Sequence, residues 1–203
     1  MRVSQQEKDR SHQRIVASAA RLMRERGLDG AGVAEVMKDA GMTAGGFYRH
    51  FASKDDLAAA AVGAAFEQTL ARFDAHDEHA QTVDTVAEFE RFYLSESHVD
   101  NPGYGCPIAA LAGELSRSPA LETPMTAGVE ATIARLTAGR SGSPRDDRAE
   151  AAARLAMMAG AVAIARASDP VTAQFVLGSV RERLGLDDPT PPRRTGSNQG
   201  DES

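Results

Sequence analysis

The sequence predicts an all-α protein with an N-terminal head of three helices, a larger helical body, and nine to ten helices in total. Alanine is abundant, and apolar residues recur at the three- and four-residue spacing of helix faces. Signals for β-strands are sparse. At 203 residues the chain is long enough to bury an adequate core.

The first helix is expected over about residues 9–26, and Gly27 is expected to end it because glycine adopts positive φ readily. An apolar stripe at helical spacing supports this helix, and four arginines are expected to lie off the stripe. The stripe holds Ile15, Ala19, Leu22 and Met23, and the arginines are Arg14, Arg21, Arg24 and Arg26.

Two short helices joined by a tight turn are predicted next, within residues 33–57. Gly41 stops the first of them, and Thr43 can cap the second by accepting a backbone N–H bond. Phe47 and Phe51 lie four residues apart, which predicts that they pack on the core. Two helices crossing at a glycine-containing turn form a helix-turn-helix, whose second helix fits the major groove of DNA.

This region closely resembles the DNA-binding signature of the tetracycline-repressor (TetR/AcrR) family of one-component transcriptional regulators. The resemblance covers about a quarter of the chain. It implies a DNA-binding domain over 1–53 and an effector-binding and dimerisation domain over 54–186; residues 187–203 have the composition of a disordered tail. The matching runs are Ala40-Gly41-Met42-Thr43, Gly46-Phe47-Tyr48-Arg49-His50-Phe51 and Ser53-Lys54-Asp55-Asp56-Leu57.

The resemblance assigns DNA contacts to the third helix and to the start of the fourth. Tyr48, His50 and Lys54 match positions that hold phosphates, and their side chains can donate hydrogen bonds to an anion. Arg49 is the side chain best able to read a guanine by bidentate bonds. Small residues lie at the front of the helix, so groove shape is expected to carry more of the specificity. These residues are Thr43, Ala44, Gly45 and Gly46.

Six further helices are expected in the body. Prolines at first helical positions favour three of the starts. The expected elements are a fourth helix from Ser53 through Phe73, a loop over 74–84, a fifth helix over about 84–98, helices from Pro107 and Pro119, an eighth over about 146–167 and a ninth from Pro170.

The last two long helices are expected to form a homodimer, as the resemblance implies. Small residues allow two helices to approach closely, and a two-fold dimer places two recognition helices about one turn of DNA apart. The alternative is that these helices complete the core of the monomer. The expected dimer residues are Ala149, Ala152, Ala153, Ala156 and Gly160, with Phe175, Val176 and Val180.

The middle helices are expected to enclose a pocket for a small lipophilic or electrophilic effector. Cys106 lies at a helix start, where the helix dipole favours a reactive thiolate; the alternative is a buried thiol that acts as a small hydrophobe. Packing in the core is likewise the alternative for every other lining candidate. The predicted effector-binding residues are Phe66, Phe89, Phe92, Tyr93, Tyr104, Cys106, Leu111, Met125, Val129 and Met158.

Charge gives little support for a nucleic-acid partner. The net charge is −6, and residues 1–58 hold ten Lys and Arg against eight Asp and Glu. A domain with so small an excess of positive charge is only weakly marked as a DNA binder. The acidic remainder of the chain can limit non-specific attraction to phosphate.

Several other classes of protein are disfavoured by the sequence. A single cysteine permits no internal disulfide, and no apolar window is long enough to span a membrane, so we expect a cytoplasmic protein without membrane contact. The pair His76 and His79 suggests a metal site, but a solvated loop is favoured, and we expect neither metal nor cofactor. The protein is not expected to be an enzyme. The alternatives to a regulator are a small all-α enzyme and a helical interaction module that does not bind DNA.

Overall fold

The computed structural model describes residues 5–79, 85–138 and 142–186, with side chains from 75 to 79 excluded. Every element in these ranges is a helix, which confirms the predicted all-α class. The predicted tail over 187–203 lies outside the described residues. The elements are α1 (Gln5–Gly30), α2 (Val33–Asp39), η1 (Ala44–Arg49), α3 (Lys54–His79), α4 (Thr85–Tyr93), α5 (Glu96–Asp100), η2 (Pro102–Tyr104), α6 (Pro107–Leu115), η3 (Pro119–Leu121), α7 (Glu122–Thr137), α8 (Pro144–Ala167) and α9 (Pro170–Leu184), where η denotes a 3-10 helix.

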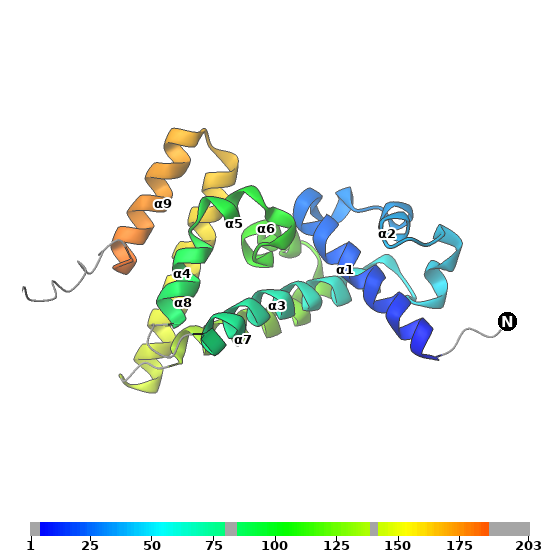
Figure 1. Cartoon of the computed structure of the whole chain (residues 1–203), viewed down its shortest axis with the longest axis horizontal. Coiled ribbons are helices and arrows are strands. Elements are labelled where there is room, and N and C mark those ends of the chain that lie inside the picture. The colour runs from blue at the N-terminus through cyan, green and yellow to red at the C-terminus, as the bar shows by residue number, and fades with distance from the viewer. Residues whose placement is uncertain (1–4, 80–84, 139–141, 187–203) are drawn as a thin grey trace, which may run out of the picture.

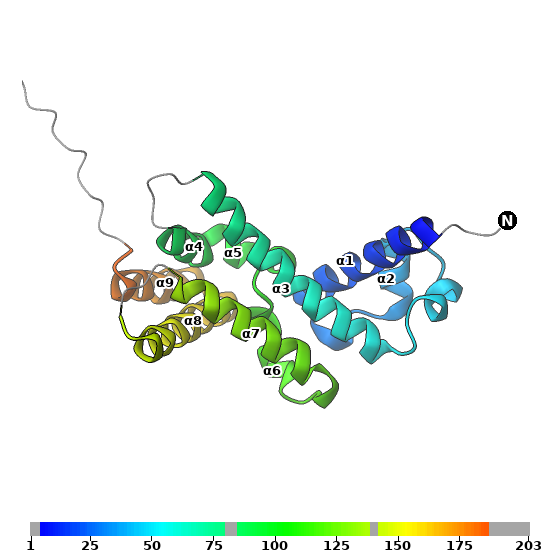
Figure 2. The ribbon, with the colours of Figure 1, turned by 90° about the horizontal axis from the view of Figure 1, so that it is seen from below.

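The molecule is elongated, with a small head at one end and the pair α8–α9 at the other (Figure 1). The head consists of α1, α2 and η1, and α1 packs on both α3 and α6. Helix α3 begins beside the head and runs into the body, where it lies along α7 (Figure 2). It is therefore the helix through which a change in the body can reach the head.

Two hydrophobic clusters form the core. The first joins the head to α3 and α6, and includes Ile15, Phe47 and Leu111. This cluster contains residues from both before and after position 53, so the head and the start of α3 share one core. The second lies among α4, α7, α8 and α9, and includes Phe89 and Met158. The boundary at 53/54 stays a prediction.

Side-chain caps fix three of the helix starts. Ser53 Oγ accepts from the Asp56 amide, while the Asp56 carboxylate accepts from the amide of Ala52, so both sides of the α3 start are satisfied. Ser143 Oγ accepts from the Asp146 amide before α8. Asp169 caps α9 through the amides of Val171 and Thr172. Pro144 and Pro170 occupy the first positions of their helices.

The predicted end of the first helix at Gly27 is confirmed: its φ of 81° interrupts α1, and only a short second part continues to Gly30. Two other predicted boundaries were wrong. Helix α3 continues to His79, where a loop from Asp74 was predicted. The predicted fifth helix is two helices, α4 and α5, because Ser95 adopts an extended conformation and its side chain caps a new start by accepting from the His98 amide.

Candidate functional site

The recognition segment, residues 43–50, follows a tight turn after α2. Gly41 has a φ of 74°, as predicted for the residue that stops the helix. Thr43 lies at the N-cap of η1, but its side chain makes no capping bond, so the predicted cap was wrong. Its carbonyl accepts from the Gly46 amide at 3.0 Å. A 3-10 helix replaces the expected α-helix here, which fits the poor helix propensity of Gly45 and Gly46.

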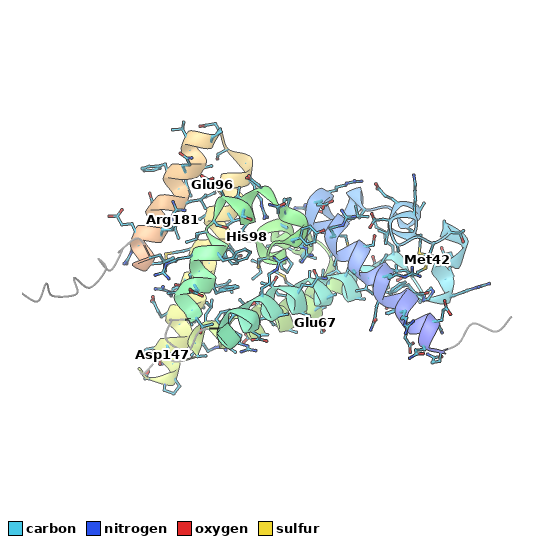
Figure 3. All side chains as sticks on the ribbon, viewed as in Figure 1. Met42, Glu67, Glu96, His98, Asp147 and Arg181 are labelled. Carbon is cyan, nitrogen blue, oxygen red and sulfur yellow. The ribbon has the colours of Figure 1, made fainter. Side chains whose placement is uncertain are left out.

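Two aromatic side chains hold the recognition segment on the head. Phe47 and Phe51 are buried, as predicted, with ring centroids 5.7 Å apart. The ring of His12, from α1, stacks on Phe51 at 4.6 Å. Figure 3 shows Met42 in the turn that leads into this segment. The core contacts leave the opposite face of the segment free.

That free face carries the predicted DNA contacts. Tyr48 is 80% exposed, and Arg49 is also exposed. A Cβ atom added at Gly45 would meet nothing within 4 Å, and one at Gly46 would meet only the Met37 methyl at 3.5 Å. Packing therefore does not require glycine at these positions. Their effect is to leave a surface that another molecule's backbone can approach closely.

His50 ends the recognition segment, and Lys54 is the first residue of α3. Burial lowers the pKa of His50, and the charges of His12, Lys8 and Arg49 lower it further, so the imidazole is predominantly neutral at pH 7. Its Nδ1 atom is buried and has no hydrogen-bond partner, so a phosphate would have to be met by Nε2. Lys54 Nζ lies 3.4 Å from a carboxylate oxygen of Asp29, in an exposed pair of the kind that contributes little stability. The Lys54 side chain could therefore leave Asp29 at little cost.

A groove of about 600 Å³ borders the recognition segment, and α1 supplies one of its walls. Sequence reasoning did not identify this wall. No functional role was predicted for residues of the first helix. The groove is lined by Gln5, Lys8 and Ser11 on α1, and by Met42, Thr43, Gly46, Arg49 and His50.

The predicted effector-binding residues do not surround one cavity. Most of them fill the two cores, and Tyr104 is 54% exposed. Phe66 packs so closely on α7 that a Cβ at Gly128 would lie 2.1 Å from its ring. Phe66, Leu111, Met125 and Val129 belong to the first core or its edge, whereas Phe89, Tyr93, Cys106 and Met158 belong to the second, and Phe92 is half-buried.

A hollow of about 780 Å³ lies elsewhere, between the head and the α8–α9 pair, and none of the predicted lining residues contributes to it. We call it the junction hollow. The helices α1, α5, α6, α8 and α9 all contribute to its walls. Its charged side chains include Arg24 on α1 and Arg166 on α8. Arg24 was expected off the buried stripe of its helix, but it is only 4% exposed.

Buried polar groups gather beside this hollow. The Cys106 amide donates to His98 Nε2 at 2.9 Å, so the ring proton lies on Nδ1, which donates to the Tyr93 carbonyl at 2.6 Å. Burial lowers the pKa of His98 to about 4. Figure 3 shows His98 near the middle of the molecule, between the head and α9. The imidazole is therefore a neutral structural link between α5 and the start of α6.

The Cys106 thiol differs from the sequence-based expectation. Burial raises its pKa, and this effect outweighs the lowering by the Tyr93 hydroxyl and by the amides of Ile108 and Ala109. The pKa of Tyr93 is raised as well, chiefly by burial and then by Cys106. The expected shift towards thiolate is therefore wrong for this state of the protein, and the alternative of a buried thiol fits better.

The predicted dimer surface is partly open in the single chain. Ala149, Ala153 and Ala156 are exposed on α8, and Phe175 is 74% exposed on α9. Val176 and Val180 instead pack partly against the chain's own second core. Ala152 and Gly160 are half-buried, and Ile164 and Val171 add further exposed apolar surface. No helix in the described parts of the chain combines the length and the apolar character needed to cross a membrane.

Comparisons with known proteins agree with the motif and the fold. Residues 15–61 match the model of bacterial regulatory proteins of the tetR family. The chain is 32% identical over 92 residues to YvdT, an uncharacterized HTH-type transcriptional regulator of Bacillus subtilis (strain 168). That match spans 44% of this chain and about half, 47%, of the curated relative.

Solved structures share the fold over most of the length. A TetR-family transcriptional regulator from Cytophaga hutchinsonii superimposes with a TM-score of 0.70 at 22% identity, covering 91% of this chain and 97% of that one. A TetR transcriptional regulator from Chloroflexus aurantiacus J-10-FL gives a TM-score of 0.67 at 25% identity, covering 89% and 96%. Residues 15–61 are thus those of a tetR-family regulatory protein, and the described chain as a whole has the fold of TetR-family regulators.

Proposed function

We propose that this chain is a homodimeric, ligand-responsive DNA-binding transcriptional regulator that acts as a repressor. The observation that carries the proposal is the two-sided recognition segment. Phe47 and Phe51 anchor it in the head, while Tyr48 and Arg49 project from its exposed side. The core therefore holds the segment in place, while its exposed side stays available for contact with DNA.

Phosphates and bases would be contacted by different residues of this face. Tyr48, His50 and Lys54 are proposed to hold phosphates, because all three side chains can donate hydrogen bonds to an oxygen. Arg49 is proposed to read a base edge. Thr43, Ala44, Gly45 and Gly46 offer little side chain for readout, and their small size favours close approach and recognition of groove shape.

A second copy of the chain would complete the regulator. The open alanines of α8 and the exposed Phe175 of α9 support an interface through these two helices. Burying Phe175 and Val171 against a partner would remove apolar surface from water. The two heads would then face DNA in a fixed spacing, which is what makes the arrangement of the subunits matter for affinity.

Ligand response would act through α3, which connects the head to the body (Figure 1). A ligand that binds one arrangement of α3 better than another shifts the population of the two arrangements. Only about 1.4 kcal/mol of differential binding is needed for a tenfold loss of operator affinity. We infer no catalytic role, and a protein that binds the chromosome acts in the cytoplasm.

The test is DNA binding by the full-length protein, measured by fluorescence anisotropy on DNA that flanks its own gene. We expect tighter binding to that DNA than to a scrambled sequence of equal length. Arg49→Ala should relax the preference at one base position. Arg148→Ala is the control, because Arg148 pairs with Glu130 in the body and lies far from the recognition segment in the chain. Equal affinity for both DNAs would contradict the proposal.

A further inference from the structure

Arg24 is a buried cation whose hydrogen bonds all go to neutral groups. It donates to the side-chain oxygen of Gln68 at 2.7 Å, and to the carbonyls of Gly105 and Ala65 at 3.3 and 3.4 Å. Its Nε atom has no partner. Burial, and after it the charge of Arg72, lower its pKa to about 10. Among the described residues Arg24 therefore has no ion-pair partner, and the carboxylate of Glu25 acts on it only as a nearby charge.

Arg166, on α8, is half-buried and also bonds only to neutral groups. It donates to the carbonyls of Val99 and His98 at 3.1 and 2.8 Å, and its Nη1 atom is buried without a partner. Burial lowers its pKa as well. No carboxylate of the described residues forms an ion pair with either arginine. An unpaired buried charge is costly, and a chain usually provides a partner for it.

The same helix shows that this chain can provide such a partner. Twelve residues before Arg166, Arg154 forms two bonds with the fully buried carboxylate of Glu90, at 2.7 and 2.5 Å. Glu90 raises the pKa of Arg154. Arg154 is thus paired with a carboxylate inside the protein, whereas Arg166 has no carboxylate partner among the described residues.

Arg24 and Arg166 both line the junction hollow and flank Gly105. Arg24 donates to the Gly105 carbonyl, and a Cβ at Gly105 would lie 2.8 Å from Arg166 Nη2. The acidic residues in the lining form no ion pair with either arginine: Glu25 is bonded to Arg21 and acts on Arg24 only as a nearby charge, Glu96 accepts from Gln174, and Asp100 has no ion pair with either of them. Apolar side chains from α8 and α9, such as Ala165 and Leu177, line another part of the hollow.

We propose that the junction hollow binds an organic anion, with its carboxylate between Arg24 and Arg166 and its apolar part against α8 and α9. Arginine suits this task because its planar fork matches a carboxylate. The two arginines come from the head and from the α8–α9 pair, so a bound anion would connect these parts of the molecule. Its role as the effector rests on the proposed regulatory function, whereas binding of the anion does not.

Binding is tested on the full-length protein without DNA, by thermal unfolding and by calorimetric titration with sodium octanoate. We expect octanoate to raise the melting temperature and octan-1-ol, which lacks the charge, to raise it less. Arg166→Gln should weaken octanoate binding by about tenfold or more, as expected for the loss of a charge-assisted hydrogen bond. Arg181→Gln is the matched control, because Arg181 on α9 also bonds a carbonyl, that of Leu94, but does not line the hollow.

A second variant protects the test against a folding defect in Arg166→Gln. Ala173 lies in the wall of the hollow and is half-buried, so Ala173→Phe should fill the hollow and abolish octanoate binding while the melting temperature of the free protein is maintained. The proposal is overturned if octanol binds as well as octanoate, if carboxylates from acetate to decanoate all fail to bind, or if both variants bind octanoate like the wild type.

A DNA arm distinguishes this proposal from the regulatory function. Operator affinity is measured with and without saturating octanoate. If octanoate binds but the protein has no preference for its flanking DNA, the anion site stands and the regulatory proposal fails. If the DNA preference is present and octanoate does not bind, the anion site fails alone. A change in operator affinity that disappears in Arg166→Gln would support the anion as effector.

Discussion

The recognition segment and the segment from His98 to Cys106, here called the junction segment, use similar residues for opposite purposes. Each contains a 3-10 turn and two glycines. Gly45 and Gly46 have room for a side chain, whereas a Cβ at Gly103 or Gly105 would lie within 2.6 Å of a neighbouring side-chain atom. Gly45 and Gly46 leave a surface without protruding side chains, whereas Gly103 and Gly105 permit tight packing.

The polar side chains of the two segments differ in the same way. Tyr48 and Arg49 project into solvent, while His98 and Cys106 are buried, and the His98 ring accepts from the backbone amide of Cys106. Substitutions at the buried residues of the junction segment should therefore change the free energy of unfolding. Substitutions at the exposed residues of the recognition segment should change DNA affinity and leave stability nearly constant. Four predictions test this division.

The largest effect is expected at Gly105. In Gly105→Ala the new methyl group would lie 2.6 Å from His98 Nε2 and 2.8 Å from Arg166 Nη2, so both side chains must move. Overpacking and weakened hydrogen bonds should together lower the free energy of unfolding by about 3 kcal/mol. Urea unfolding at pH 7.5 measures it. An unchanged midpoint would show that the junction segment is not tightly packed.

The next effect is a pH dependence that arises from His98. Its folded-state pKa is about 4, below the ordinary value of 6.5, so between these values the unfolded chain binds a proton that the folded protein does not. Stability therefore falls as pH falls through this range. At pH 5 the loss relative to pH 7.5 should be about 2 kcal/mol. His98→Gln should remove this component of the pH dependence, and an identical pH profile in that variant would contradict the assignment.

A smaller effect, on affinity alone, is expected at Tyr48. Tyr48→Phe removes one hydroxyl from an exposed ring and should weaken operator binding by about tenfold, as for a lost hydrogen bond to a charged phosphate. Its melting temperature should not change. Tyr104→Phe is the control, since that ring is also largely exposed but belongs to the junction segment. Equal losses of affinity in both variants would mean that Tyr48 has no special position.

The smallest effect on stability is expected at Gly45. Because nothing lies within 4 Å of an added Cβ, Gly45→Ala should stabilise the free protein by about 0.5 kcal/mol or leave it unchanged. DNA affinity should nevertheless fall, because the methyl group prevents close approach. Thermal unfolding and anisotropy are measured on the same preparation. An unchanged affinity would show that the DNA does not approach this residue closely.

The head was predictable from the sequence because its signals are local. Gly41 stops a helix within its own turn, and Phe47 and Phe51 share a face that any helical reading of the segment reveals. Even there the type of helix was missed. The 3-10 form of η1 reflects the competition between a helical pattern and two adjacent glycines, and the pattern alone does not decide it.

The site in the body could not be predicted in this way because its contacts connect distant parts of the chain. Arg24 is buried through bonds to residues 41, 44 and 81 positions away, and no local pattern indicates them. The effector-binding residues were predicted from the apolar faces of helices, and most of these residues pack in the two cores. A signal was present at Gly103 and Gly105, whose spacing beside Pro102 marks a segment of close approach.

The most direct test of the account is the salt dependence of operator affinity, compared between the wild-type protein and Lys54→Ala. If the recognition segment and the start of α3 bind DNA, affinity should fall steeply as salt rises, because phosphate contacts release counterions. Lys54→Ala should reduce the slope by about one for each lost contact, with an unchanged melting temperature. A wild-type affinity that does not depend on salt, or an identical slope in the variant, would contradict the account.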